Sequence, residues 1–414
     1  MKLLVCEHVS GGGFANHKIP TDILCEGFGM LRSLLSDLKE SGHDTTTLVD
    51  TRLAKFNPPL EAKKIIAVDS PGNWEKSFKK ALKLSDAAYF IAPESDQMLQ
   101  RLIEEAQDLG KVTLNCQVAA INTAANKNTT YETLKKARVP LPETLTFSFG
   151  EALQQVRQKL RKLGYPLVFK PSTSVSCKGI SVVSNENEMK MAINKMKAES
   201  STESFLVQKL FSGIAASVSL ISTGMEATPI TLNEQLLTLE PASSHLDSWY
   251  YGGVVPLHHP MEKAAFEIAK KAVEAIRGLA GYIGVDMVLT RRGPVVMEIN
   301  PRLTTSYVGL TKVVDFNVAQ AILTAVIEHR IPRKVQVSDC VFFSKVKVKS
   351  PTCEALFKTY ASGEVVSPPF PIGDNGGTYA LLASKASNRE KAELGFKIAQ
   401  THLNNIISNE VNVF

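Results

Sequence analysis

The sequence contains no run of about 18 apolar residues, the length that a membrane-spanning helix needs. Its six cysteines are scattered without a C-x-x-C pair, which excludes a zinc site of the usual spacing and, in a chain of 414 residues, a disulfide framework. The first residues are too polar, and their apolar run is too short, for a secretory signal. We therefore expect a protein of the cytosol without a membrane partner.

The sequence also lacks an extreme composition. Hydrophobic residues make up 44% and charged residues 21%, which excludes a disordered chain, a collagen and a coiled coil. The net charge of +6 is modest and the basic residues are dispersed, without a zinc, helix-turn-helix or aromatic RNA-binding signature. We therefore expect no nucleic-acid partner, although such an excess suits an anionic ligand.

What is present is an alternation of strands and helices. Short apolar strands alternate with amphipathic helices over the first part of the chain, which predicts a mostly parallel open sheet. One of these amphipathic helices spans 26–40. Beyond this part of the chain, helices and strands follow in a mixed order typical of α+β units, with a loop over 243–253 and an apolar helix over 316–327 that Asp315 would cap. At about 100–200 residues per domain, the length allows two to four units, and we expect their bounds at 1–120, 121–210, 211–332 and 333–414.

Residues 284–302 hold the most informative pattern. Two apolar strands, 282–289 and 295–300, flank a short loop of Arg291, Arg292 and Gly293, which predicts a β-hairpin with a three-residue loop. In that register Asp286 lies opposite Glu298 and Gly284 lies opposite Asn300. Period-two alternation places Asp286, Glu298, Asn300 and Arg302 on one face, with Met287, Met297 and Ile299 in a core on the other.

Two carboxylates opposed on one sheet face repel each other unless a cation lies between them. Carboxylate and amide oxygens are ligands for a hard divalent ion, so Asp286, Glu298 and Asn300 predict a site for Mg²⁺ or Mn²⁺. Arg302 suits a phosphate oxygen. The alternative is a solvated polar face, which the otherwise apolar strands disfavour.

Three further segments carry weaker signals for phosphate or nucleotide contacts. Lys170 ends an apolar strand and is either an edge residue turned to solvent or a phosphate ligand. The small polar loop from Ser172 to Gly179 follows it, and backbone N–H groups in such a loop can hold phosphates. Lys127 precedes a predicted helix. Gln208, Lys209 and Leu210 close another strand, where backbone atoms can meet an adenine edge.

In this order, the segments resemble the ATP-grasp superfamily of carboxylate–amine ligases. The resemblance implies an ATP-grasp fold: an α/β pre-ATP-grasp domain with a parallel sheet (1–120), a lid subdomain (121–210), a catalytic subdomain (211–332) and a small C-terminal α+β unit (333–414). It implies ATP and Mg²⁺ or Mn²⁺ as cofactors. It also implies nucleotide contacts at Lys127, Lys170, Ser172, Gly179, Gln208, Lys209 and Leu210, with Lys170 and Arg302 catalytic. Lys209 departs from the acidic residue that many members carry at this place.

The activity that the resemblance implies is amide formation. A carboxylate is activated by ATP as an acylphosphate, and an amine then displaces the phosphate. Segments 7–13, 251–256 and 300–307 resemble the group of this superfamily that includes tyramine–L-glutamate ligases of methanofuran biosynthesis, which implies γ-glutamyltyramine as the product. The alternatives are another acid–amine pair or a nucleotide-binding protein without catalysis.

Residues of these segments and of one more strand are candidates for substrate contacts. The loop of Ser10, Gly11, Gly12 and Gly13 follows the first strand, where open α/β sheets bind ligands, although it also reads as a flexible connector. Glu7 would hold an ammonium group and Thr304, Thr305 and Ser306 a carboxylate. Tyr250 and Tyr251 would either stack on an aromatic amine or pack in the core. Asn233 and Gln235 share one face of their strand.

The sequence leaves two questions open. The expected partners are a small-molecule acid and an amine, and a homo-oligomer remains open. Residues 333–414 would either complete a sheet or form a dimer contact.

Overall fold

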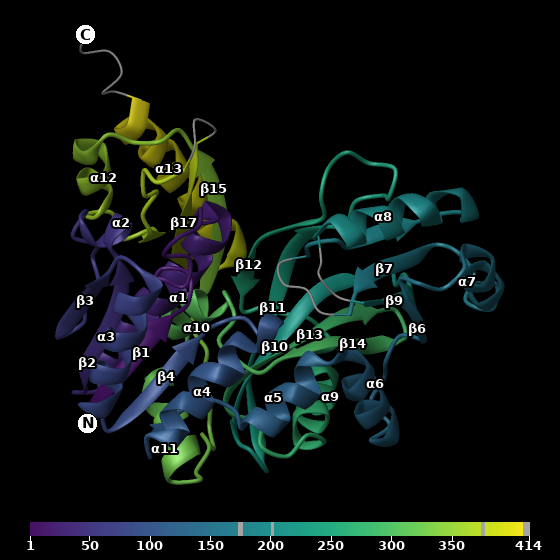
Figure 1. The fold of residues 1–414 in the computed structure, drawn as a ribbon, viewed down its shortest axis with the longest axis horizontal. Helices are drawn as coiled ribbons and strands as arrows, with labels where there is room; N and C mark the ends of the chain where they lie inside the picture. Colours follow the sequence, from purple (N-terminus) through teal and green to yellow (C-terminus); the bar gives the residue numbers. More distant parts are fainter. Residues whose placement is uncertain (173–176, 200–202, 374–376, 409–414) are drawn as a thin grey trace.

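The computed structural model describes residues 1–172, 177–199, 203–373 and 377–408. Within these residues the strands form three sheets of five, four and eight strands, called here the N-terminal, small and large sheets. Figure 1 shows the N-terminal and small sheets on opposite sides of the molecule, with the large sheet running from one to the other. No helix in the described part of the chain is long and apolar enough to cross a membrane.

The N-terminal sheet is entirely parallel, with the order β3-β2-β1-β4-β5, as the sequence predicts. Its strands are β1 (Lys2–Glu7), β2 (Asp44–Asp50), β3 (Lys64–Val68), β4 (Ala87–Ile91) and β5 (Val112–Thr113). Its helices are α1 (Thr21–Glu40), α2 (Thr51–Ala54), α3 (Pro71–Lys83), α4 (Met98–Asp108) and α5 (Val118–Ala125). Helix α3 was not expected. It begins at Pro71 after Ser70, whose hydroxyl accepts a hydrogen bond from Asn73 N.

The small sheet is antiparallel, with the order β6-β9-β7-β8, and has its own core, in which Phe147, Phe169 and Phe205 are stacked. Its strands are β6 (Thr144–Ser148), β7 (Leu167–Pro171), β8 (Ser181–Val183) and β9 (Ser204–Lys209). The helices of this segment are α6 (Lys127–Lys136), α7 (Leu153–Leu160) and α8 (Met189–Glu199). A separate core makes this sheet a packing unit of its own.

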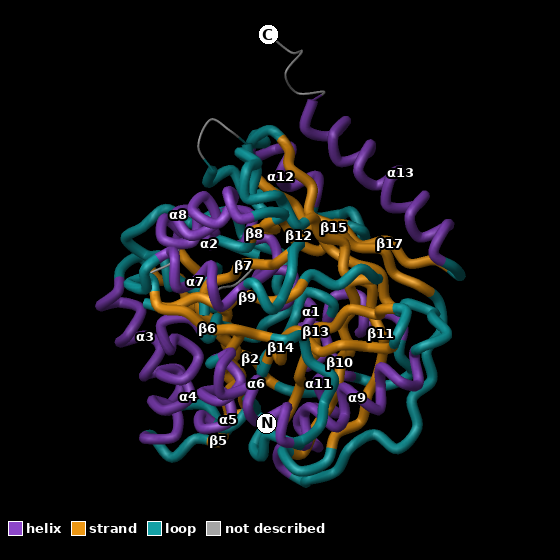
Figure 2. Tube along the Cα trace, turned by 90° about the vertical axis from the view of Figure 1, so that its right-hand side faces the viewer, coloured by secondary structure: helices purple, strands orange, loops and turns teal. Residues whose placement is uncertain are grey.

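The large sheet has the order β14-β13-β10-β11-β12-β15-β17-β16. Its strands are β10 (Ile214–Thr223), β11 (Ala227–Thr238), β12 (Trp249–Val255), β13 (Ala280–Thr290), β14 (Gly293–Asn300), β15 (Cys340–Val348), β16 (Val365–Ser367) and β17 (Thr378–Ala386). Its helices are α9 (Glu262–Glu274), α10 (Tyr307–Val313), α11 (Val318–Ile327), α12 (Cys353–Thr359) and α13 (Arg389–Ser408). Figure 2 shows α13 over the end of this sheet, where Phe396 and Leu403 share a core with Val346 and Leu382.

The C-terminal strands answer one of the open questions, because β15, β16 and β17 extend the large sheet beyond β12. The chain after residue 333 therefore completes a sheet. The division of the chain into four units with the bounds given above stays a prediction.

Three local expectations were wrong. Residues 243–253 were expected to form a loop, but 249–253 belong to β12, which pairs with both β11 and β15. The hairpin loop contains only Arg291 and Arg292, because Thr290 pairs with Gly293. Asp315 does not cap α11. Asn317 does, since its side chain accepts a hydrogen bond from Gln320 N at 2.9 Å.

Candidate active site

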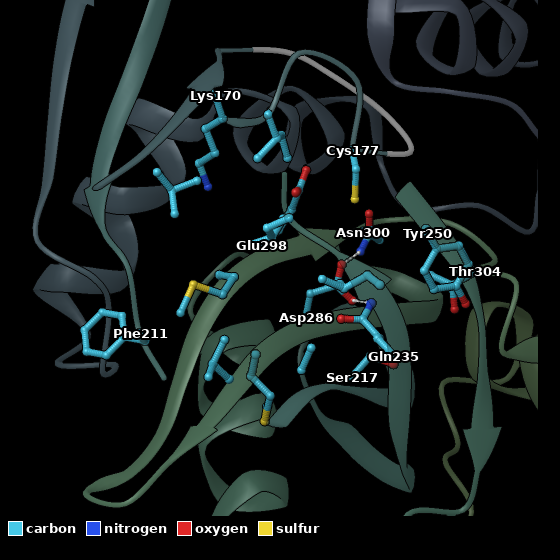
Figure 3. Close-up of a pocket in the computed structure, with 18 of the residues that line it drawn as sticks. Lys170, Cys177, Phe211, Ser217, Gln235, Tyr250, Asp286, Glu298, Asn300 and Thr304 are labelled. Carbon is cyan, nitrogen blue, oxygen red and sulfur yellow. Dashed lines mark hydrogen bonds between the residues drawn. The ribbon is translucent and has the colours of Figure 1, made fainter. Parts of the chain in front are cut away.

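A cavity of about 370 Å³ lies between the small and large sheets. Strands β7 and β9 form one wall, and β10, β11, β13 and β14 form the other (Figure 3). The cavity collects most of the residues that the sequence singled out: Lys170, Gln208, Lys209, Leu210, Gln235, Tyr250, Asp286, Glu298, Asn300, Arg302, Thr304, Thr305 and Ser306. Residues far apart in the chain therefore share one site.

The β13–β14 pairing brings the three expected metal ligands together. Asp286 pairs with Glu298 and Gly284 with Asn300, in the register predicted from the sequence. Asn300 Nδ2 donates to Asp286 Oδ2, and Gln235 Nε2 donates to Asp286 Oδ1, both at 3.1 Å (Figure 3). The Asp286 carboxylate is thus held in a fixed orientation toward the cavity.

A bulge next to this pair changes one expectation. The register shifts after Asp286, so that Met287 pairs with Val296 and Met297 has no partner residue. An extra residue in one strand shifts the side chains beyond it to the opposite face of the sheet. Val296 consequently packs in the core, and Met297, which was expected there, lines the cavity.

The pKa values of the two carboxylates in this pair are shifted in opposite directions. Burial and the neighbouring Glu298 carboxylate raise the pKa of Asp286 to about 6. Burial also acts to raise the pKa of Glu298, but the ammonium groups of Lys127 and Lys170 outweigh it and lower that pKa. Lys127 Nζ lies 3.1 Å from Glu298 Oε1. Burial, together with Lys127, lowers the pKa of Lys170 to about 8.

This donor set fits a divalent cation. The raised pKa of Asp286 reports a carboxylate that is buried beside a second one, which is the situation a bound cation relieves. No cluster of three or more His, Cys, Asp or Glu occurs among the described residues, so a cation here would have two carboxylates and the Asn300 amide oxygen. Mg²⁺ commonly takes one or two carboxylates and completes its shell with water and phosphate oxygens.

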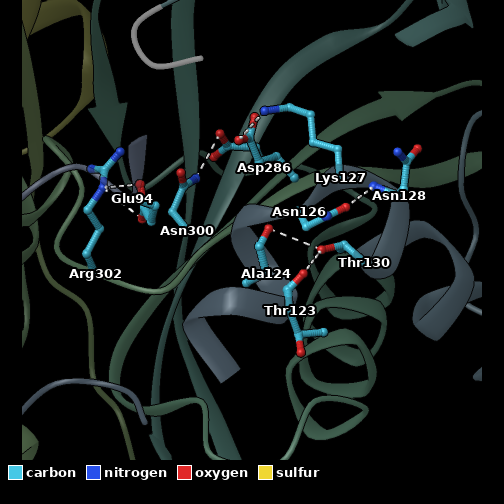
Figure 4. A network of polar contacts seen from close by, with 11 residues as sticks. Glu94, Thr123, Ala124, Asn126, Lys127, Asn128, Thr130, Asp286, Asn300 and Arg302 are labelled. Atoms are coloured by element: carbon cyan, nitrogen blue, oxygen red, sulfur yellow. Dashed lines mark hydrogen bonds and ion pairs between the residues drawn. The ribbon is translucent and has the colours of Figure 1, made fainter. Parts of the chain in front are cut away.

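Lys127 and Lys170 approach the acidic pair from two different elements, α6 and β7. Asn126 caps α6 by accepting hydrogen bonds from Asn128 N and Thr129 N, which makes Lys127 the first residue of the helix (Figure 4). Lys170 lies on β7 and is 7% exposed. Lys170 is therefore not an edge residue turned to solvent, which was the alternative to a phosphate ligand.

The part of the cavity near Gln208, Lys209 and Leu210 is largely apolar, with walls formed by Val168, Ile180, Phe211, Leu237, Leu239, Met287 and Met297. Gln208 Nε2 donates to Thr144 Oγ1 at 2.8 Å, and Leu210 N donates to Pro166 O at 3.2 Å. Apolar walls with a few polar groups are typical of a site for a flat aromatic ring.

Around the loop, Ser172 N donates to Ser204 O at 3.1 Å, and Gly179 adopts a positive φ of 71°. Neither Ser172 nor Gly179 lines the cavity, whereas Cys177 between them does. Residues 173–176 of the predicted loop lie outside the described residues.

Arg302 lies on the other side of Asn300 and pairs with Glu94 (Figure 4). Its Nε is 3.0 Å from Glu94 Oε1 and 3.1 Å from Oε2, and its Nη1 donates to Leu303 O. Burial lowers the pKa of Arg302, but Glu94 outweighs it and raises that pKa. Arg302 therefore remains a cation at the cavity wall.

Several predicted substrate residues lie elsewhere. The buried Glu7 carboxylate accepts hydrogen bonds from Val9 N, Ser10 N and Ser10 Oγ. None of Glu7, Ser10, Gly11, Gly12 or Gly13 lines the cavity between the small and large sheets, nor do Asn233 and Tyr251. Asn233 is buried and donates to Ser219 Oγ, while the Tyr251 hydroxyl accepts from Thr238. Their role as substrate contacts stays a prediction.

Sequence reasoning missed five polar residues at or behind the wall: Glu26, Glu94, Ser217, Glu234 and Lys345. Cys177 also lines the cavity and belongs to the predicted loop. Glu26 was expected only as the first residue of a helix, and no local pattern distinguishes it. Lys345 carries one signal, since it interrupts a strand that is otherwise largely apolar, as Lys170 does.

The chain is similar to proteins of a known family. The chain matches the ATP-grasp domain family over residues 124–306 and the pre ATP-grasp 3 domain family over residues 43–121. It is 30% identical to a tyramine–L-glutamate ligase of Methanocaldococcus jannaschii over 312 residues, 74% of this chain and 84% of that protein.

Two solved structures have a similar fold. An ATP-grasp superfamily protein from Archaeoglobus fulgidus has a TM-score of 0.61 at 23% identity, covering 93% of this chain and 99% of the other. The biotin carboxylase domain of the Hydrogenobacter thermophilus 2-oxoglutarate carboxylase, in complex with MgADP, has a TM-score of 0.68 at 15% identity. That match covers 94% of this chain and 87% of the other.

Proposed function

Because the chain belongs to the ATP-grasp family of carboxylate–amine ligases, we propose that it uses ATP to join L-glutamate to tyramine, giving γ-glutamyltyramine for methanofuran biosynthesis. The fold predicted from the sequence, an ATP-grasp fold with a pre-ATP-grasp domain, is confirmed. Members of this family are ATP-dependent ligases that form ADP and phosphate. The acid, the amine and the residue roles below are our proposal.

The first step is activation of the acid. A carboxylate oxygen of the acid attacks the γ-phosphorus of ATP, the bond from that phosphorus to the β-phosphate oxygen breaks, and an acylphosphate and ADP result. Such a transfer needs an aligned acceptor and compensation of charge more than covalent help from the protein. Lys127 and Lys170 supply two positive charges next to Glu298, and Arg302 supplies a third on the acceptor side.

Asp286, Glu298 and Asn300 would hold a divalent cation, Mg²⁺ or Mn²⁺, which would supply neutralisation of the negative charge of the phosphates. Gln235 fixes the Asp286 carboxylate through its 3.1 Å hydrogen bond. The apolar end of the cavity at Gln208, Lys209 and Leu210 receives the adenine ring.

The second step is amide formation. The amine nitrogen attacks the acyl carbon, phosphate leaves, and the nitrogen loses a proton. An acylphosphate reacts readily with water, so the cavity between the two sheets protects it by excluding solvent.

The observation that carries the proposal is the opposition of Asp286 and Glu298, with Asn300 and two lysines, inside one cavity. Glutamate and tyramine are supported by the relative that is 30% identical over most of the chain. We also propose the cytosol as the compartment, since all six cysteines are free thiols.

The test is a screen of acid–amine pairs for ADP formation with Mg²⁺ or Mn²⁺, followed by mass analysis of the product. We expect ADP release that requires both L-glutamate and tyramine, and a product with the mass of glutamyltyramine. Release with a different acid or amine would replace the substrates but keep the ligase. Tight ATP binding without turnover of any pair would favour a nucleotide-binding protein without catalysis.

A further inference from the structure

A buried charge cluster lies at the wall of the cavity. Glu26 comes from α1, Thr305 follows β14, Tyr250 lies on β12 and Lys345 lies on β15. Glu26, Thr305 and Tyr250 line the cavity, whereas Lys345 lies behind Glu26. Figure 3 places Tyr250 and the neighbouring Thr304 on the opposite side of Asn300 from Lys170 and Phe211.

The Glu26 carboxylate is held from two sides. Lys345 Nζ donates to Glu26 Oε1 at 2.6 Å, and Thr305 Oγ1 donates to Glu26 Oε2 at 2.6 Å. Lys345 Nζ also lies 4.4 Å from the ring centre of Trp249 and 5.8 Å from that of Tyr250, within the range of cation–π contacts. The whole-residue exposure is 7% for Glu26 and 9% for Lys345.

The stability of the fold does not require this buried charge cluster. A buried ion pair adds little net stability, because apolar residues of similar volume serve as well. The carboxylate also keeps unused acceptor positions, since two oxygens offer about four and each has one donor among the residues that the structure describes. Because Glu26 lines the cavity, those positions are available to a ligand.

The partners of Glu26 determine what kind of group it suits. Burial lowers the pKa of Lys345, but the Glu26 carboxylate outweighs it and raises that pKa, so Lys345 stays charged beside Glu26. The Glu26 carboxylate accepts hydrogen bonds from an ammonium group and a hydroxyl and still presents oxygen acceptors to the cavity. It therefore suits a ligand group that carries N–H donors and a positive charge, such as an ammonium group.

Glu94, another carboxylate of the cavity wall, is already paired. Glu94 faces Arg302 at 3.0 Å, and that guanidinium group is the cation we assign to the acceptor side of the phosphoryl group. Glu26, in contrast, is paired with a lysine that does not line the cavity. Arg302, the partner of Glu94, lines the cavity, whereas Lys345, the partner of Glu26, does not.

We propose that Glu26, positioned by Lys345 and Thr305, binds the α-ammonium group of the acid substrate and so selects an α-amino acid over the same acid without that group. This inference rests on the proposed function, because it takes the cavity to be the site of an acid-activating ligase. It also gives the C-terminal strand β15 a part in specificity, since β15 supplies Lys345.

The test compares L-glutamate with glutarate, which lacks the α-ammonium group, in ADP formation with ATP and tyramine. The variant is the double substitution Glu26→Gln with Lys345→Met, which removes both charges and leaves no unpaired ion in the interior. We expect the wild-type protein to prefer L-glutamate and the variant to lose at least tenfold of that preference, through KM for L-glutamate. The kcat/KM for glutarate should change less than about threefold.

Two further variants keep the result interpretable. The control is Asp339→Asn with Lys385→Met, which removes an ion pair of 3.1 Å next to β15 and away from the cavity, and should keep the preference. Glu94→Gln tests the other carboxylate. An unchanged preference in the Glu26 variant, or a loss of preference in the Glu94 variant alone, would overturn the proposal.

A failure of the proposed function gives a different result. If another acid is the substrate, the same comparison is made with that acid and its analogue without the α-amino group, and a substrate lacking an α-amino group overturns the inference. If no pair is turned over, calorimetry with a non-hydrolysable ATP analogue measures binding of L-glutamate and glutarate. Equal affinities, or binding of neither acid, would overturn the inference as well.

Discussion

At the residue scale, one carboxylate is in contact with or close to most of the charges of the site. Glu298 lies opposite Asp286, 3.1 Å from Lys127 and near Lys170. Two positive groups keep Glu298 ionised, while the raised pKa of Asp286 leaves that second carboxylate easier to protonate. Of the two proposed metal ligands, Glu298 is therefore the one more readily ionised, which makes its substitution the more informative one.

We predict that Glu298→Gln lowers the rate of ADP formation at least a hundredfold while the protein stays folded. The amide removes the charge of the proposed metal ligand, and it also removes the repulsion on Asp286, so we expect the cost to fall on phosphoryl transfer and not on folding. The measurement is steady-state ADP release, with circular dichroism as the test of folding. Activity within tenfold of wild type, which corresponds to about 1.4 kcal/mol, would show that the assigned role is wrong.

A control for this substitution lies on α3. Glu75→Gln makes the same chemical change at an exposed i,i+4 pair with Lys79, far in sequence from the site. Such surface pairs contribute little to stability. The Glu75 variant should therefore retain wild-type activity, which ties any loss in the Glu298 variant to the site.

At this scale the sequence predicts what depends on local pairing. The opposition of Asp286 and Glu298 follows from strand periodicity and a short turn, and it is confirmed. The position of Met297 was wrong because nothing in the pattern signals a bulge. Glu26 and Lys345 could not be paired from the sequence, since their contact depends on how α1 packs against β15.

At the element scale, β12 shows why a glycine pair misled the prediction. Glycine weakens an isolated strand, so residues 243–253 favoured a loop. In the structure β12 is an interior strand between β11 and β15. A Cβ atom on Gly253 would lie 2.4 Å from the Glu234 carbonyl oxygen. The neighbouring backbone requires glycine here, and only the assembled sheet reveals that requirement.

We predict that Gly253→Ala lowers the free energy of unfolding by about 1–3 kcal/mol, the usual cost of forcing atoms into a packed interior. The obstructing atom belongs to the backbone of β11, so it cannot move without disturbing the β11–β12 pairing. Urea unfolding followed by circular dichroism measures the change. The variant should also bind substrate less well, because Tyr250 lies on the same strand and lines the cavity.

The matched substitution is Gly72→Ala in α3, where a new Cβ would meet no atom within 4 Å. Alanine favours a helix over glycine by up to about 1 kcal/mol, so this variant should be as stable as wild type or more stable. Equal destabilisation by both substitutions would mean that the close approach in β12 is not the cause.

At the scale of the whole molecule, α1 joins parts that are distant in the sequence. Its residues Leu31, Leu34 and Leu38 share one core with strands of the N-terminal sheet and with Tyr282 and Tyr307 of the later chain. The sequence predicts α1 as an amphipathic helix, but its buried residues lie on nearly every side. The sequence alone does not distinguish a helix that two sheets cover from a helix at the surface, because the difference depends on where both sheets lie in the folded protein.

The polar contact in this joint gives the molecule a pH-dependent stability. Tyr307 Oη donates to Asp37 Oδ2 at 2.7 Å, and Asp37 is 8% exposed. Burial raises the pKa of Asp37 to about 7, with Glu40 adding to the rise and Tyr307, Ala319 and Lys312 opposing it. Because the unfolded chain releases this proton near pH 3.8, the stabilisation is complete below that pH and is lost as the pH rises to about 7.

We predict that Asp37→Asn removes this dependence. From pH 5 to 7.5 the wild-type protein should lose about 2–3 kcal/mol of unfolding free energy relative to the variant, at about 1.4 kcal/mol for each pH unit up to the folded pKa. Comparing the two proteins at each pH cancels the groups that they share, and urea unfolding supplies the values. The exposed Asp108→Asn substitution should leave the profile unchanged. Parallel profiles for wild type and Asp37→Asn would mean that Asp37 ionises in the folded protein as it does in the unfolded chain. Burial between α1 and Tyr307 would then not raise the pKa of Asp37.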